Sequence, residues 1–239
     1  MRARKTIWPC QKRSEEVVSI VLGVIIRDLD GNREMIFASD GRVLEHGTKN
    51  VRNEDYPKIK KLGSKACMGY AGHSGELFED VFNIMDAELK IMKNKDLMFV
   101  SNKLGQVIFD MLKSQRHAEI EKHFGPLNHH FIIGGFYNKK PRINVLLSSK
   151  GYQITKQDLS YSTNVTIDIL GSSDEIQQKM KEICQNRLGH AQSFDDIVKN
   201  IRYAISKVAE QTHDVNNHIF VRRLSKGFEL ESYLGYEQM

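Results

Sequence analysis

Two residues in the stretch 35–62, an acid and a lysine, stand at positions where they could take part in proton transfer or hold a charge in place. Asp40 stands where an apolar strand pattern ends, and Lys58 stands in a later segment where apolar and basic residues alternate. Positioned carboxylates and amines are common participants in acid–base chemistry. Taken singly, Asp40 beside Gly41 is also typical of a turn, and Lys58 is also typical of a solvated strand face. The elements around the pair must therefore decide between these interpretations.

Those elements alternate between groups of strands and pairs of helices. Apolar runs and period-two patterns predict strands at 17–26, 34–39, 56–62, 64–72, 129–136, 142–149, 151–155, 217–224 and 227–234. Apolar residues at helical spacing predict a helix that begins near Ser74 and further helices over roughly 96–123, 172–188 and 193–211. Serines and acids at the start of the last two helices are suited to N-terminal capping.

This order of elements indicates the fold class. Each helix pair has an apolar face that needs a sheet, and two such sheets also need each other. We therefore expect an α+β protein, a four-layer αββα sandwich of two antiparallel sheets flanked by helix pairs. No repeat, low-complexity tract or Gly/Ser linker divides the chain. The expected organisation is a basic leader or propeptide-like tail at 1–18 followed by one domain at 19–239.

The charge distribution and the cysteines limit the function classes. Of the formal net charge of +5, most comes from the basic tail before residue 17, which lacks the interleaved aromatic residues of nucleic-acid binders. Nucleic-acid binding is therefore not expected. The three cysteines form no CxxC pair, and neither a signal peptide nor a membrane-spanning segment is evident. We expect a cytoplasmic protein with no membrane partner.

Histidines close together in the sequence are candidate metal ligands. The closest groups are His129 with His130, His213 with His218, and His117 with His123, but none forms an HExxH motif or a Cys/His cluster. Strand and loop histidines are the simpler interpretation. We expect no metal and no cofactor.

Four short motifs resemble one known family. The chain carries SIVLGVI, then IFASDGR, then YPKIKKL, and then MGYAGHSGELF at the start of a long helix. In sequence and in order these motifs resemble the proteasome β-type and bacterial proteasome-like peptidases, which are N-terminal-nucleophile hydrolases. The resemblance covers the chain from about Val17 to Leu230.

The resemblance assigns roles to individual residues of this chain. It implies that Ser19 is the nucleophile, at the place where the family has a threonine or less often a serine or cysteine. It places Asp40 and Lys58 around that nucleophile. It also implies that the backbone N–H of Gly72 faces the substrate carbonyl, because Gly72 follows Lys58 at the family's interval.

Two further positions match the family with departures. Gly171-Ser172-Ser173 corresponds to a Gly-Ser-Gly whose serine supports the terminal amine, so Ser172 takes that role although the last glycine is replaced. Asp214 corresponds to an acid after the fourth helix, but the segment THDVNNH replaces the family's Arg-Asp and Ser-Gly.

The chemistry that the resemblance implies needs a free α-amine. With a pKa near roughly 7.7 to 8, that amine is well suited to take the proton of a hydroxyl nucleophile. A lysine that stays positive lowers the pKa of its neighbours, and an adjacent carboxylate holds the lysine in place. Val18 stands where the family usually has a glycine, and its β-branched side chain stiffens the bond that must be cleaved.

Three functions remain open from the sequence. The first is a peptidase that acts on peptides or unfolded proteins after removal of the leader, assembled as a homo-oligomer or with related ring subunits and served by an ATPase unfoldase. The second is a non-catalytic scaffold subunit of a self-associating ring that keeps its leader. The third is a binding module that uses the basic tail.

Overall fold

The computed structural model describes the chain in thirteen ranges: 19–27, 33–44, 50–63, 66–72, 75–92, 96–114, 118–119, 129–137, 140–157, 165–171, 174–191, 193–224 and 230–235. It is an α+β protein with antiparallel sheets and four helices of 15 to 17 residues. In these ranges no helix is long and apolar enough to cross a membrane. The expected leader at 1–18 lies outside the described residues.

The first sheet places the residues before β1 next to the end of β2. Its strand order is β10–β1–β2–β11–β12, and all neighbours are antiparallel. The register pairs Val21 with Ser39 of β2 and with Leu170 of β10. Ser19 and Ile20 therefore lie beside the ends of both neighbouring strands. The strands are β1 (Val21–Arg27), β2 (Arg33–Asp40), β10 (Val165–Leu170), β11 (Ile219–Leu224) and β12 (Leu230–Gly235).

The second sheet has the order β5–β6–β7–β8–β9 and is antiparallel throughout. Its strands are β5 (Ile59–Leu62), β6 (Ala66–Gly72), β7 (His129–Tyr137), β8 (Lys140–Leu147) and β9 (Ile154–Gln157). A short 3-10 helix, η1 (Ser148–Lys150), precedes β9. Between β2 and β5 in the sequence, β3 (Val43–Leu44) pairs with β4 (Val51–Asn53).

The four helices begin where the sequence supplies caps and apolar spacing. They are α1 (Gly75–Ile91), α2 (Leu97–Leu112), α4 (Asp174–Leu188) and α5 (Phe194–Ala209). The Asp96 side chain accepts a hydrogen bond from Met98 N at the start of α2. The Ser193 hydroxyl accepts one from Asp196 N at the start of α5, at 3.1 Å, which confirms the predicted cap.

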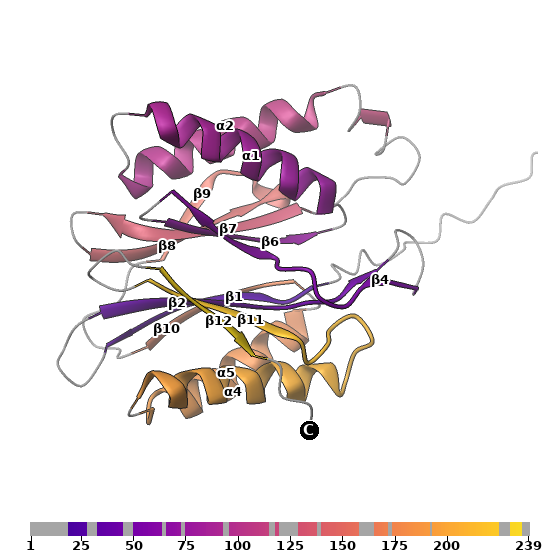
Figure 1. Cartoon of the computed structure of the whole chain (residues 1–239), viewed down its shortest axis with the longest axis vertical. Helices are drawn as coiled ribbons and strands as arrows, with labels where there is room; N and C mark the ends of the chain where they lie inside the picture. Colours follow the sequence, from indigo (N-terminus) through magenta and orange to yellow (C-terminus); the bar gives the residue numbers. More distant parts are fainter. Residues whose placement is uncertain are drawn as a thin grey trace, which may run out of the picture.

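Three apolar clusters hold these elements together. One joins the face of β1 that carries Leu22 and Val24 to α4 and α5. A second joins the second sheet to α1 and α2. The third contains residues of both sheets, including Val21 and Ile25 on the opposite face of β1. In Figure 1, α1 and α2 lie over the second sheet, while α4 and α5 lie on the far side of the first.

The element predictions were wrong at several points. Helix α2 ends at Leu112 and not near His123, since the polar Lys113 and Ser114 that follow it leave the helix, although residues 118–119 are helical again. The short strands β3 and β4 were not predicted. Strand β10 was not predicted at all. It contains the buried Asp168, which interrupts the apolar pattern expected of a strand at this position.

Candidate active site

A buried ion pair lies at the centre of the candidate site. Asp40 is the last residue of β2, and Lys58 directly precedes β5 in the other sheet. The Lys58 Nζ atom lies 2.7 Å from Asp40 Oδ1, and the two side chains are 3% and 0% exposed. The solvated-strand interpretation of Lys58 is therefore wrong, whereas Asp40 makes the side-chain to backbone hydrogen bond of a turn residue in addition to the ion pair. Two charges removed from water in this way must compensate each other.

The Asp40 carboxylate also fixes the backbone beside Ser19. Its Oδ1 atom, the one bonded to Lys58, accepts a hydrogen bond from Ile20 N at 2.9 Å. The Asp40 N–H in turn donates to Ile20 O at 3.2 Å. The second carboxylate oxygen accepts from Arg42 N at 3.0 Å. One side chain thus joins the lysine to the residue that follows the predicted nucleophile, Ser19, which is itself only 4% exposed.

Gly171 packs against Ser19 from the other neighbouring strand. Its φ is +100°, and a Cβ atom added there would lie 1.6 Å from the Ser19 backbone oxygen. Only glycine therefore fits at this position. Ser172, the residue predicted to support the terminal amine, lies outside the described residues, so its role stays a prediction.

Gly72 and Lys58 lie at the same end of the second sheet. Gly72 is the last residue of β6 and is partly exposed. Two residues earlier, Tyr70 N donates to the Lys58 carbonyl at 3.0 Å. The role of the Gly72 N–H toward a substrate stays a prediction.

Asp214 lies within electrostatic reach of Lys58. Burial lowers the pKa of Lys58, and the Asp40 carboxylate opposes that change through its charge and its hydrogen bond. The Arg42 charge lowers the same pKa further, whereas the Asp214 charge raises it. Asp214 is partly buried in the connection between α5 and β11. Ser19, Asp40 and Lys58 thus lie in one region, and the loop that carries Asp214 is bonded to the residue after Asp40 through Asn216.

A polar network that the sequence did not predict borders the ion pair. The Arg42 guanidinium binds both oxygens of the Glu54 carboxylate, with Nε–Oε2 and Nη2–Oε1 distances of 3.0 Å. Asn216 is 5% exposed and donates from Nδ2 to the Glu54 carbonyl at 2.8 Å and to the Glu54 carboxylate. Burial acts to raise the pKa of Glu54, but these hydrogen bonds and the Arg42 charge outweigh it and lower that pKa.

The sequence gives only a weak signal for Asn216. The residue belongs to the segment THDVNNH, whose one notable feature is its departure from the family pattern. Its partners, Gly41 and Glu54, lie more than 160 positions away in the chain. Only the folded arrangement of β2, β4 and the connection before β11 brings them together.

Two of the described histidines contact a tyrosine and an aspartate. His129 is buried and shares a hydrogen bond of 2.8 Å between its Nδ1 and the Tyr70 hydroxyl. His218 Nδ1 lies 2.6 Å from Asp55 Oδ1. Among the described residues, no group of three His, Cys, Asp or Glu side chains could hold a metal ion.

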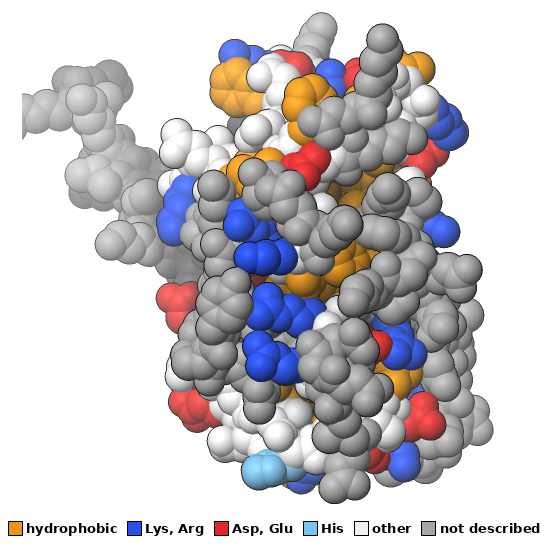
Figure 2. All heavy atoms as spheres, turned by 90° about the vertical axis from the view of Figure 1, so that its left-hand side faces the viewer, with side chains coloured by type: hydrophobic (Ala, Val, Ile, Leu, Met, Phe, Trp, Pro, Cys, Tyr) orange, Lys and Arg blue, Asp and Glu red, His pale blue; other side chains and the backbone are white. Residues whose placement is uncertain are grey.

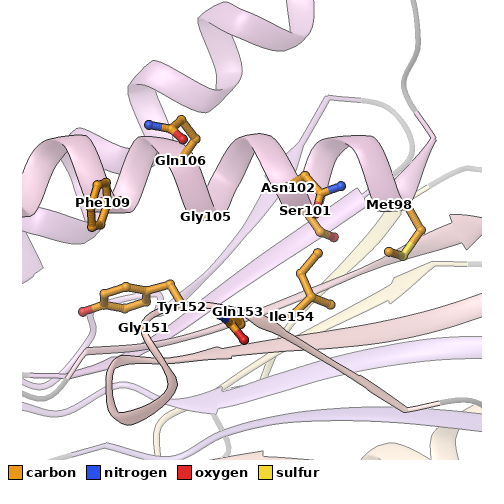
Figure 3. A pocket seen from close by; sticks show the side chains of 10 residues that line it. All are labelled: Met98, Ser101, Asn102, Gly105, Gln106, Phe109, Gly151, Tyr152, Gln153 and Ile154. Atoms are coloured by element: carbon orange, nitrogen blue, oxygen red, sulfur yellow. The ribbon is translucent and has the colours of Figure 1, made fainter.

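A separate cleft of about 430 Å³ lies between α2 and the segment that leads into β9 (Figure 3). Phe109 and Tyr152 line one part of it, and Met98 and Ile154 line another. None of the predicted site residues borders this cleft. It is therefore not part of the candidate site.

Basic side chains also gather on the surface. Figure 2 shows Lys and Arg side chains together over the middle of one face. The exposed aromatic residues of the described ranges, Phe99, Phe109 and Tyr203, lie on α2 and α5. Lys113 lies over the Phe109 ring, and Arg187 lies over the Tyr203 ring.

Comparison of the chain with protein-family models finds no match, and a search of curated proteins finds none either.

Proposed function

We propose that the two sheets and four helices form the four-layer αββα sandwich of the proteasome type. The three apolar clusters support this arrangement, because one lies between the sheets and each of the others joins one sheet to one helix pair. The order of the elements along the chain is also the order that the family resemblance implies.

The function that this site supports best is hydrolysis of peptide bonds by an N-terminal nucleophile, Ser19. One observation carries the proposal: a single oxygen atom, Asp40 Oδ1, bonds both the Lys58 ammonium and the backbone N–H next to Ser19. A positive charge is thereby held in a buried setting beside the residue whose amine and hydroxyl would react. Such a charge favours the neutral form of a nearby amine, which is the form that acts as a base.

The reaction begins with maturation. Water cleaves the Val18–Ser19 peptide bond, which releases the leader and gives Ser19 a free α-amine. In catalysis this amine takes the Oγ proton while Oγ bonds to the carbonyl carbon of the substrate peptide. The proton then passes to the departing nitrogen as the C–N bond breaks. A water molecule hydrolyses the resulting ester and restores the Ser19 hydroxyl.

The backbone N–H of Gly72 is the proposed donor to the oxyanion of this reaction, a contribution of order 3 kcal/mol in comparable acyl-transfer sites. Ser172 and Asp214 are the proposed supports of the terminal amine. The substrates would be peptides or unfolded proteins, delivered by an ATPase unfoldase to a ring of this or related subunits.

A scaffold subunit without activity is the second candidate, and one observation favours it. Ser19 is 4% exposed, so the residue is largely covered by the structure around it. Val18 also lacks the flexibility of the family's glycine at the position that must strain for cleavage. A chain that is never cleaved keeps the ion pair and the fold but has no base for its hydroxyl.

Intact-mass measurement of the purified protein, followed by treatment with a peptide epoxyketone, separates these candidates. The peptidase predicts a chain that begins at Ser19 and a covalent adduct that involves its amine and hydroxyl. Ser19→Ala should block maturation and adduct formation together. A full-length chain with no adduct, in a normal oligomer, would establish the scaffold instead.

A further inference from the structure

We infer that Asn216 is a positioning residue that, together with Arg42, holds the loop 212–218 and its Asp214 carboxylate beside the Asp40–Lys58 pair. The proposed peptidase function is needed only for the consequence on turnover. The placement itself follows from hydrogen bonds that three separate segments of the chain, 41–42, 54 and 213–218, make with one another.

The first contact joins the loop to the residue after Asp40. Asn216 Oδ1 accepts a hydrogen bond from Gly41 N at 2.9 Å, and also from His218 N at 3.3 Å. A Cβ atom added at Gly41 would lie 2.4 Å from the Glu54 carbonyl oxygen. The backbones of Gly41 and Glu54 therefore approach so closely that a single carboxamide can bond to both of them.

The second contact holds the other side of Asp214. Arg42 donates from Nη1 to the carbonyl of His213, while its other guanidinium nitrogens bind Glu54. Asp214 thus lies between two anchored residues, His213 and Asn216. The loop is fixed at both points to the segment that follows Asp40.

This clamp has a chemical consequence for Lys58. The charged groups that act on the Lys58 ammonium are Asp40, Arg42 and Asp214, and of these Asp214 is supplied by the clamped loop. Glu54 neutralises part of the Arg42 charge by its ion pair. If the loop moves away, Lys58 loses one of the two carboxylates that oppose the effect of burial on its pKa.

The test is a pH titration of Lys58 in the full chain, monitored by NMR of lysine side chains labelled at Cε. The Lys58 signal is assigned by its absence in a Lys58→Met variant. Asn216→Ala should lower the Lys58 pKa, and Asp214→Asn should lower it by the same amount. The double variant should show no further fall, because both changes remove the same charge. Asn217→Ala, which alters the exposed neighbouring asparagine, should leave the titration as it is in the wild type.

Asn216→Leu and Asn216→Ser extend the test. Asn216→Leu keeps the approximate size of the side chain without adding a charge, but it loses both the acceptor for Gly41 N and the donor to Glu54, so it should behave like Asn216→Ala. Asn216→Ser, the smaller change, takes the place of Asn216→Ala if that variant does not fold. The proposal is overturned if Asp214→Asn changes the Lys58 pKa while no Asn216 variant does. It is also overturned if Asp214→Asn leaves the Lys58 pKa unchanged.

Peptidase assays of the mature protein provide the second measurement. Asn216→Ala should reduce kcat by about ten- to a hundredfold with little change in KM, as expected for a small misplacement of reacting groups. The alkaline limb of its pH profile should also move to lower pH. If the wild-type protein has no peptidase activity, the proposed function fails, while the titration still decides whether Asn216 positions Asp214.

Discussion

The Lys58 ammonium and the Asp40 carboxylate form an ion pair of 2.7 Å that joins the two sheets in a region closed to solvent. Inside a protein such a pair is stable only while both partners are present, because each charge has given up its hydration. The pair therefore couples the integrity of the fold to the integrity of the candidate site.

The first prediction is that Lys58→Ala destabilises the protein as well as removing any hydrolysis. The substitution leaves the Asp40 charge buried without its main partner, which costs about 3–5 kcal/mol in comparable cases. Urea unfolding of the variant should show this loss. The double variant Lys58→Met with Asp40→Asn should recover part of the stability while remaining inactive, because the asparagine carboxamide carries no charge and still offers an acceptor to Ile20 N.

Lys61→Ala is the matched control, because Lys61 lies on β5 only three residues after Lys58 and is exposed. Its unfolding free energy should change by less than about 0.5 kcal/mol. If Lys58→Ala proved as harmless as this control, the buried ion pair would have no structural role.

The second prediction concerns the contact between Gly171 and Ser19. Gly171→Ala would bring a Cβ atom to 1.6 Å from the Ser19 carbonyl oxygen, so the backbone of one strand must move. We expect a loss of roughly 2 to 3 kcal/mol in the free energy of unfolding, from backbone strain together with a displaced strand. Any maturation at Ser19 should stop as well.

Gly151→Ala provides the comparison for this strain. Gly151 also has a positive φ, +58°, but a Cβ atom there meets nothing within 4 Å. Its substitution should cost only about 1 kcal/mol and leave Ser19 unaffected. Equal losses in the two variants would mean that the conformation of Gly171, and not its contact with Ser19, matters.

Much of the fold could be predicted from the sequence because its signals are local. Aliphatic runs such as that of β1 and the apolar spacing in α1 identify elements without knowledge of their partners. Ser193 marks the start of α5 in the same way. Strand β10 was missed because its recognition needs β1 as a partner, and Asp168 made it look too polar for a buried strand.

The candidate site could be predicted only in part for the same reason. Asp40 and Lys58 stand out because each lies at the edge of a clear strand pattern. Asn216 and Glu54 matter through contacts between segments distant in sequence, and no local pattern reports such contacts. The burial of Lys58 is also not visible in the sequence. Lys58 and Lys61 belong to one short basic segment, and only the fold makes the first buried and the second exposed.

The third prediction is that the protein self-associates through the α1–α2 side. Ile91 is 78% exposed, Phe99 51% and Phe109 46%, and all three lie on this helix pair. Sedimentation of the wild type in the micromolar range should show an oligomer. Phe99→Ser with Phe109→Ser should shift it toward smaller species, whereas Tyr203→Ser on α5 should not. A wild type that sediments as a monomer throughout would exclude a ring subunit.

The last prediction follows from Asp168, which is 6% exposed on β10 and has one buried carboxylate oxygen without a hydrogen-bond partner. Burial raises the pKa of Asp168 from 3.8 to about 6, and the Lys181 charge only partly opposes this. Between about pH 4 and pH 6 the folded state therefore binds more protons than the unfolded state. The contribution of Asp168 to the free energy of unfolding must therefore fall as the pH rises through that window, and it stays low above it.

At pH 7 and above, this cost amounts to at most about 3 kcal/mol, from a shift of roughly two pKa units. Asp168→Asn removes the titration, so the variant should gain stability relative to the wild type as the pH rises from 4.5 to 8. Chemical unfolding at several pH values measures this difference directly. Asp174→Asn, at an exposed carboxylate on α4, should show no such pH-dependent gain. Parallel pH curves for wild type and Asp168→Asn would mean that Asp168 titrates alike in the folded and unfolded states.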